Sequence, residues 1–115
     1  MSKLKNFVIS DESNLLVASK AILANHNRCV FLERDKRIIG VFSEGDLLKA
    51  LLFGYNLQAQ IKPFINLNFF YLTEKNMIEA KSLFLNNGIS VIPVLEKKTM
   101  KLKDIITIYD VLKIY

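Results

Sequence analysis

The sequence predicts an α/β (α+β) fold made of two copies of one strand–helix–strand–strand–helix unit. Two stretches, 14–25 and 76–87, have the apolar spacing of one helix face, and their alanines Ala18 and Ala80 lie 62 positions apart (80 minus 18). Each stretch is followed by two short apolar runs around a charged turn, which is typical of a β-hairpin. Each hairpin ends in a hydroxyl residue with an aspartate three positions later. Self-similarity at a nearly fixed distance indicates a duplicated unit.

The first copy begins with an apolar strand and closes with an apolar helix. In order, we expect a strand at Phe7–Ile9, a helix at Asn14–Asn25, a strand at Cys29–Leu32, a turn at Glu33–Arg37, a strand at Ile38–Phe42 and a helix at Leu47–Leu52.

The second copy repeats this order with a longer turn. In order, we expect a strand at Asn68–Leu72, a helix at Asn76–Asn87, a strand at Val91–Leu95, a turn at Glu96–Lys101, a strand formed by Leu102 with Ile105 and Ile106, and a helix at Val111–Ile114. The aspartates that follow the two hairpins lie 64 positions apart (110 minus 46), so the second hairpin is two residues longer than the first.

A unit of about sixty residues buries too little apolar surface to be stable with ease on its own. We therefore expect the two repeats to share a core, packed sheet to sheet with pseudo-two-fold symmetry. Glycine, asparagine and proline gather in residues 54–64, which is typical of a connection. We place repeat 1 at 1–56, a linker at 57–66 and repeat 2 at 67–115.

The composition is that of an ordinary globular protein. Of the 115 residues 51% are hydrophobic and 23% charged, and the net charge is +5. The lysines are scattered among acidic residues, which favours a solvated surface over a nucleic-acid face. The N-terminus has no apolar signal region and no apolar stretch is long enough to cross a bilayer, so we expect a cytoplasmic protein without a membrane partner.

The residues needed for catalysis are scarce. The single histidine, His26, follows a helix, where a cation can interact with the last carbonyls. The single cysteine, Cys29, lies in an apolar run, which favours a buried thiol in a reducing compartment. No pair of histidines can hold a metal, and neither common phosphate-loop motif is present. We expect a protein that binds a ligand and is not an enzyme.

Two motifs in the sequence resemble those of a known protein family. They are the G-x-x-S-x-x-D of Gly40–Asp46, with its counterpart ending in Thr107–Asp110, and the I-S-x-x-P-V of Ile89–Val94. The resemblance covers essentially the whole chain and implies a tandem CBS pair, or Bateman module. The turn Ser43–Asp46 further resembles the N-terminal CBS pair of bacterial sugar-phosphate nucleotidyltransferases, although no catalytic sequence of such an enzyme is present.

The resemblance implies a ligand and partners. Ser43, Asp46, Thr107 and Asp110 would bind the ribose and phosphate of an adenosyl effector, namely AMP, ADP, ATP or S-adenosylmethionine. No cofactor is required. The resemblance also implies a homodimer formed through the repeat helices, and a regulated enzyme domain in cis or in trans.

A purely structural interpretation stands beside this one. A hydroxyl residue with an aspartate three positions later, placed before an apolar helix, also forms a capping box, which needs no ligand. On that interpretation the chain is a ligand-free dimerisation module. A nucleic-acid-binding protein is a third interpretation, which rests on the net charge alone.

The two copies also differ around these residues. Gly40 would let a ligand approach the backbone closely, whereas Asp104 stands at that position in the second copy. Asp104 would repel a phosphate that Lys101 and Lys103 would attract. Phe31 replaces the proline of the second copy and would fill an adenine slot. We expect the first site to be the better preserved.

Overall fold

The computed structural model describes residues 4–114 and divides into two compact units, with the boundary between Phe69 and Phe70. Unit 1 consists of η1 (Lys5–Phe7), β1 (Val8–Ser10), α1 (Leu15–Asn25), β2 (Cys29–Arg34), β3 (Arg37–Ser43), α2 (Glu44–Leu52) and η2 (Lys62–Phe64), where η marks a short 3-10 helix. Unit 2 consists of α3 (Met77–Asn87), β4 (Val91–Leu95), β5 (Leu102–Thr107) and α4 (Ile108–Ile114). Two sheets with helices confirm the predicted mixed α+β class. The sheet-to-sheet packing and the repeat boundaries stay predictions.

The sheet of unit 1 has the order β1-β2-β3, with β1 parallel and β3 antiparallel to β2. Asp35 and Lys36 form the turn between β2 and β3, and both have positive φ angles, 53° and 65°. A two-residue turn of this kind follows the twist of the flanking strands. The first strand begins at Val8, one residue later than predicted, because Phe7 belongs to η1.

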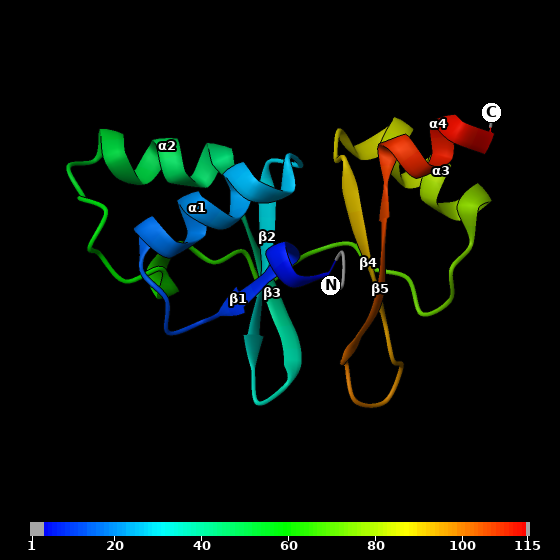
Figure 1. Ribbon diagram of the computed structural model, residues 1–115, viewed down its shortest axis with the longest axis horizontal. Helices are drawn as coiled ribbons and strands as arrows, with labels where there is room; N and C mark the ends of the chain where they lie inside the picture. The colour runs from blue at the N-terminus through cyan, green and yellow to red at the C-terminus, as the bar shows by residue number, and fades with distance from the viewer. Residues whose placement is uncertain (1–3, 115) are drawn as a thin grey trace. The chain divides into compact units, whose positions relative to one another are not determined.

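The helices α1 and α2 pack on one side of this sheet (Figure 1). Three residues of α1 at helical spacing enter the core, where they meet residues of β2, β3, α2 and the segment before η2. The buried members are Leu15, Ala18, Ile22, Val30, Leu32, Phe42, Ala50 and Ile61. The apolar periodicity of 14–25 therefore marks the face that this helix buries.

Both ends of α1 are capped by local hydrogen bonds. The Asn14 side chain accepts a bond from the amide of Val17 at 2.9 Å. His26 ends the helix in a left-handed conformation, and its backbone N–H donates to the carbonyl of Ile22 at 3.2 Å. His26 thus lies at the predicted place, but the bond to the helix comes from its backbone.

Residues 57–66, predicted as a linker, pack against unit 1. The amides of Leu15 and Leu16 donate to the carbonyls of Ala59 and Leu57, at 3.0 and 2.9 Å. Further along, Asn66 exchanges two backbone hydrogen bonds of 2.9 Å with Val41 of β3. This segment therefore covers the free edge of β3.

Gly40 allows this segment to lie close to β3. A Cβ atom at Gly40 would stand 2.4 Å from Cγ2 of Ile65 and 2.8 Å from the carbonyl oxygen of Asn66. The expectation that Gly40 makes room for a ligand is therefore wrong, because the chain itself fills that space. The glycine is needed for packing within unit 1.

In unit 2, β4 and β5 form an antiparallel hairpin that packs against α3 and α4 (Figure 1). Asn76 caps the start of α3, and Gly88 ends that helix with a φ of 64°. The buried core consists of Leu72, Ala80, Phe84, Ile92, Val94, Ile106 and Val111. The helix and hairpin of the second copy are thus confirmed.

The strand predicted at Asn68–Leu72 is wrong: only Leu72 pairs with β4. Its amide donates to the carbonyl of Pro93 at 3.1 Å, and its carbonyl accepts the amide of Leu95 at 2.8 Å. The backbone of Pro93 therefore faces this segment, but proline has no N–H with which to continue the ladder. In unit 1 Phe31 stands at that position, and β1 pairs there over three residues.

We expect Gly40→Ala to destabilise the protein by about 1–3 kcal/mol, because the added methyl group overlaps Ile65 and the Asn66 carbonyl. The matched control is Gly45→Ala in α2, where a Cβ meets only Ser43 Oγ at an ordinary 3.6 Å. Urea titrations of both variants measure the free energy of unfolding. Equal stabilities of the two variants would contradict this packing role.

Candidate functional site

Ser43 and Asp46 form a capping box where β3 passes into α2. The backbone N–H and the hydroxyl of Ser43 both donate to Asp46 Oδ2 at 2.9 Å, and the amide of Asp46 donates to Ser43 Oγ at 3.1 Å. Helix α2 begins at Glu44 and so includes Asp46 in its first turn, three residues earlier than predicted. The carboxylate is held in place by the backbone it caps.

Thr107 and Asp110 repeat this arrangement where β5 passes into α4. The amide of Thr107 donates to Asp110 Oδ2 at 2.8 Å, and the amide of Asp110 donates to Thr107 Oγ1 at 3.2 Å. This helix too begins three residues before its predicted start, at Ile108. The structural interpretation of both motifs as caps is therefore confirmed.

Capping uses only part of each carboxylate. Both aspartates are half-buried, and in each the Oδ2 atom accepts the capping bond. The other oxygen, Oδ1, has no hydrogen bond to any residue within 4–114. Each carboxylate therefore retains an acceptor with a fixed position, which is what a pair of ribose hydroxyls requires.

The two hydroxyl groups differ. The Ser43 hydroxyl donates to Asp46, so its proton is already used. The Thr107 hydroxyl accepts the amide of Asp110 and makes no other bond within the described part of the chain. Its proton therefore remains able to bind an anionic oxygen.

A backbone bond that the sequence did not reveal ties each closing helix to its hairpin. The first helical amide of α2, Glu44 N, donates to the carbonyl of Arg28 at 2.8 Å. In α4, Ile108 N donates to the carbonyl of Ser90 at 2.9 Å. Arg28 and Ser90 are 62 positions apart (90 minus 28), so the repeat alignment contained the signal that pairs them.

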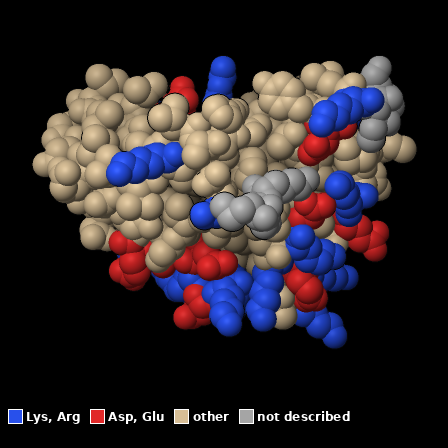
Figure 2. Space-filling view, viewed as in Figure 1, with Lys and Arg blue, Asp and Glu red and all other residues tan. Residues whose placement is uncertain are grey.

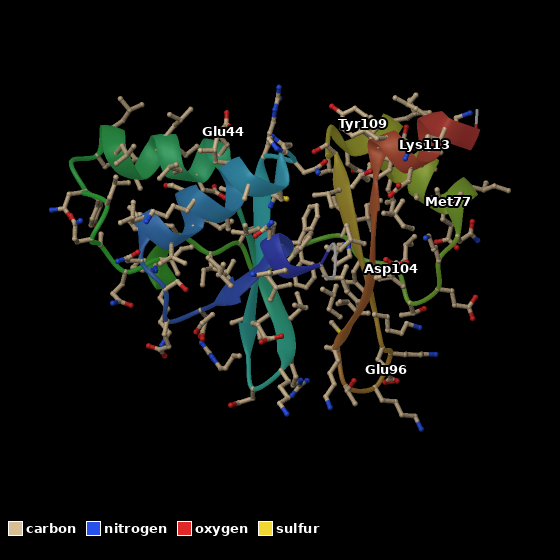
Figure 3. The ribbon with its side chains drawn as sticks, in the orientation of Figure 1. Glu44, Met77, Glu96, Asp104, Tyr109 and Lys113 are labelled. Carbon is tan, nitrogen blue, oxygen red and sulfur yellow. The ribbon has the colours of Figure 1, made fainter. Side chains whose placement is uncertain are left out.

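Asp104 stands in unit 2 at the position that Gly40 has in unit 1, and its side chain has a charged partner. Its Oδ2 forms an ion pair with Lys75 at 3.2 Å, and Lys103 Nζ donates to the carbonyl of Thr73 at 2.7 Å. Figure 3 places Asp104 midway along β5, and Tyr109 of α4 beyond the end of that strand. Lys75 therefore offsets part of the Asp104 charge, and the expected effects of Lys101 and Lys103 on a phosphate stay predictions.

Cys29 lies directly across the ladder from Ser43, and Val91 takes the equivalent place opposite Thr107. Although part of the residue is exposed, burial raises the pKa of the Cys29 thiol from 9.0 to about 12. The thiol is therefore protonated at neutral pH.

Phe31, at the proline position of the motif, is 2% exposed. That it fills an adenine slot stays a prediction.

Within residues 4–114, no three His, Cys, Asp or Glu side chains gather as a metal site would require. Across the same residues, no helix combines the length and apolar character needed to span a bilayer.

We expect Asp46→Ala and Asp110→Ala each to lower the free energy of unfolding by about 1 kcal/mol, because each removes a helix cap. Glu44→Ala serves as the control, since Glu44 is an exposed acid in the same turn. Chemical denaturation measures all three. A loss in Asp46→Ala no larger than in Glu44→Ala would show that the box adds nothing to stability.

We expect native Cys29 to react slowly with iodoacetamide. The thiolate is the reactive form, and a pKa of about 12 in place of 9.0 lowers its fraction at pH 8 about a thousandfold. Alkylation rates in native and in urea-unfolded protein, followed by mass spectrometry, measure the ratio. Similar rates in the two states would contradict the protective burial.

The comparisons with known proteins agree with the duplicated architecture. The family model described as "CBS domain" matches residues 1–53 and again 69–115. No curated protein matches the chain. Among solved structures, a CBS domain protein from Pyrobaculum aerophilum complexed with AMP is similar at 18% identity and a TM-score of 0.76, over 96% of this chain and 89% of that one.

Two further structures have the same fold. A CBS-domain-containing protein from Agrobacterium tumefaciens is similar at 21% identity and a TM-score of 0.74, over 93% of this chain and 86% of that one. The cytosolic domain of the Mg²⁺ channel MgtE in complex with ATP is similar at 17% identity and a TM-score of 0.74, over 94% of this chain and 44% of that one. At such identities the likeness shows the fold alone.

Proposed function

Because the chain belongs to the CBS domain family, whose members are regulatory modules, we propose that it binds an adenine nucleotide or another adenosyl compound and controls an enzyme. The candidate effectors are AMP, ADP, ATP and S-adenosylmethionine. The proposed ligand residues are Ser43, Asp46, Thr107 and Asp110.

One observation carries this proposal. In both repeats, an aspartate at the same position uses one carboxylate oxygen to cap a helix and leaves the other oxygen without a hydrogen bond within residues 4–114. A cap alone needs one carboxylate oxygen, and Oδ1 of Asp46 and of Asp110 stays open. A carboxylate oxygen held by its own backbone accepts hydrogen bonds without further loss of side-chain freedom. The solved relatives complexed with AMP and with ATP support the choice of an adenine nucleotide.

Regulation follows from differential binding. A ligand shifts an equilibrium between two arrangements of a protein only by the difference in its affinity for them, which is typically about 1–3 kcal/mol. We propose that nucleotide binding at the capped aspartates supplies this difference. The regulated enzyme is attached or associated, and the turn Ser43–Asp46 favours a sugar-phosphate nucleotidyltransferase.

We further propose a cytoplasmic homodimer formed through the repeat helices. The helices present large apolar side chains to solvent, which is typical of a protein interface. On α1 and α2 these are Val17, Leu23, Leu48, Leu51 and Leu52; on α3 and α4 they are Ile78, Leu85, Tyr109 and Leu112. The free thiol of Cys29 supports a reducing compartment.

Calorimetric titration of the four candidate effectors tests the ligand. We expect at least one to bind, and we expect Asp46→Asn or Asp110→Asn to weaken it about tenfold or more, because a hydrogen bond to a charged group is lost while an amide oxygen still caps the helix. Glu44→Gln is the control and should bind as the wild type does. Failure of all four effectors to bind at millimolar concentration would refute the proposal.

The alternative, a ligand-free dimerisation module, is favoured by the completeness of the caps. On either interpretation, Leu52→Glu/Leu112→Glu should give a monomer by light scattering, because it places charges on two residues that are 86% and 62% exposed. Gln58→Glu, on an exposed loop, should stay dimeric. A monomeric wild type would contradict the dimer, and a dimer without any nucleotide-induced thermal shift would favour the alternative.

A further inference from the structure

The turn between β4 and β5 concentrates positive charge. Residues 96–103 contain four exposed lysines and one glutamate, which leaves a net charge of +3. We call this segment the lysine turn; its lysines are Lys97, Lys98, Lys101 and Lys103. In Figure 2 blue atoms gather over this turn, at the end of the β4–β5 hairpin.

The acidic side chains near the lysine turn are already engaged. Glu96 Oε1 accepts the backbone amides of Lys98 and Thr99, at 2.7 and 3.0 Å. These two bonds, the one from Thr99 first, hold the pKa of Glu96 below its ordinary value. Asp104 forms its ion pair with Lys75, outside the turn. Glu96 is therefore ionised and offsets one of the four lysine charges, so that the turn keeps its net charge of +3.

The corresponding turn of unit 1 is different. It has three cationic and two acidic side chains. One of the cations, Arg34, binds the buried Asp11 through Nε and Nη2, which both lie 2.7 Å from Asp11 Oδ2. The remaining Lys36 and Arg37 balance Glu33 and Asp35. The positive turn is therefore a property of the second repeat and not of the fold.

We propose that the lysine turn is a docking surface for an acidic segment of a partner protein. Nucleic-acid affinity rises with the number of phosphates that a protein neutralises and with the stacking of bases on aromatic or arginine side chains. The turn has four lysines but neither arginine nor an aromatic side chain. Stable membrane anchoring needs a second, apolar signal, and Met100 of the turn is half-buried. An acidic protein segment needs only a few charges for steering, because other contacts supply affinity.

The location of the turn within unit 2 keeps this surface separate from the Thr107–Asp110 pair. Figure 3 shows Glu96 at one end of the hairpin and Tyr109, in the first turn of α4, at the other. A partner on the lysine turn therefore leaves the Thr107–Asp110 pair accessible. The inference stands whether or not a nucleotide binds.

The test uses fluorescent poly-L-glutamate of about twenty residues as the acidic probe, with duplex DNA and phosphatidylserine vesicles as the other two probes. Lys97→Gln/Lys98→Gln/Lys101→Gln removes three charges from the turn. The control, Lys5→Gln/Lys36→Gln/Arg37→Gln, removes three exposed charges from unit 1 and has the same net charge.

We expect the turn variant to bind poly-L-glutamate at least about tenfold more weakly than the wild type at low salt, and the control to bind within about twofold of it. The wild-type affinity should fall as salt is raised from about 50 to about 200 mM. The proposal is overturned by absence of binding, by an equal loss in the control, or by tighter binding of DNA or vesicles through the same three lysines.

Discussion

An exchange of hydrogen bonds between a hydroxyl residue and an aspartate three positions later fixes where each hairpin ends and each closing helix begins. In unit 1 it joins Ser43 to Asp46, and in unit 2 it joins Thr107 to Asp110. A second bond, from the first helical amide to the residue that precedes β2 or β4, anchors the helix to the hairpin. Together they satisfy amides that a helix start would otherwise leave without a partner. The position of the candidate ligand oxygen follows from these bonds.

Both units have this capping arrangement, but they differ at the position occupied by Gly40 in β3 and by Asp104 in β5. The edge of β3 is covered by Asn66, and Gly40 makes the close approach possible. At the equivalent place in β5, Asp104 binds Lys75. Charged side chains are a common way to protect the edge of a sheet. The second unit thus carries a charged side chain with an ionic partner at the position where the first unit has a glycine.

The repeat made most of this fold predictable from the sequence. Helical spacing and charged turns are local patterns, so α1, α3 and both hairpins could be recognised. The strand at Asn68–Leu72 was wrong because its pairing depends on Pro93, some twenty residues further along, whose missing N–H interrupts the ladder. The role of Gly40 depends on Ile65 and Asn66, which no local pattern links to it.

The candidate site could be predicted in part for the same reason. The sequence located both aspartates, and capping was already one of the interpretations. The sequence did not show that the two carboxylate oxygens differ. In each aspartate Oδ2 accepts the capping hydrogen bond from the backbone, and Oδ1 has no hydrogen bond within residues 4–114. Nor did it show that the Ser43 hydroxyl donates to its own aspartate, a bond absent from the described contacts of Thr107. Such differences depend on side-chain rotamers, which composition and spacing do not specify.

The capping role of each aspartate has an evolutionary consequence. A duplicated gene segment that ceased to recognise an effector would still be selected to keep its aspartate, because loss of the cap weakens the whole unit. Divergence between paralogous halves would then accumulate in neighbouring residues that the cap does not need, such as Phe31 against Pro93 or Arg28 against Ser90. In this chain, a difference in ligand binding between the two halves would be recorded at such neighbouring positions.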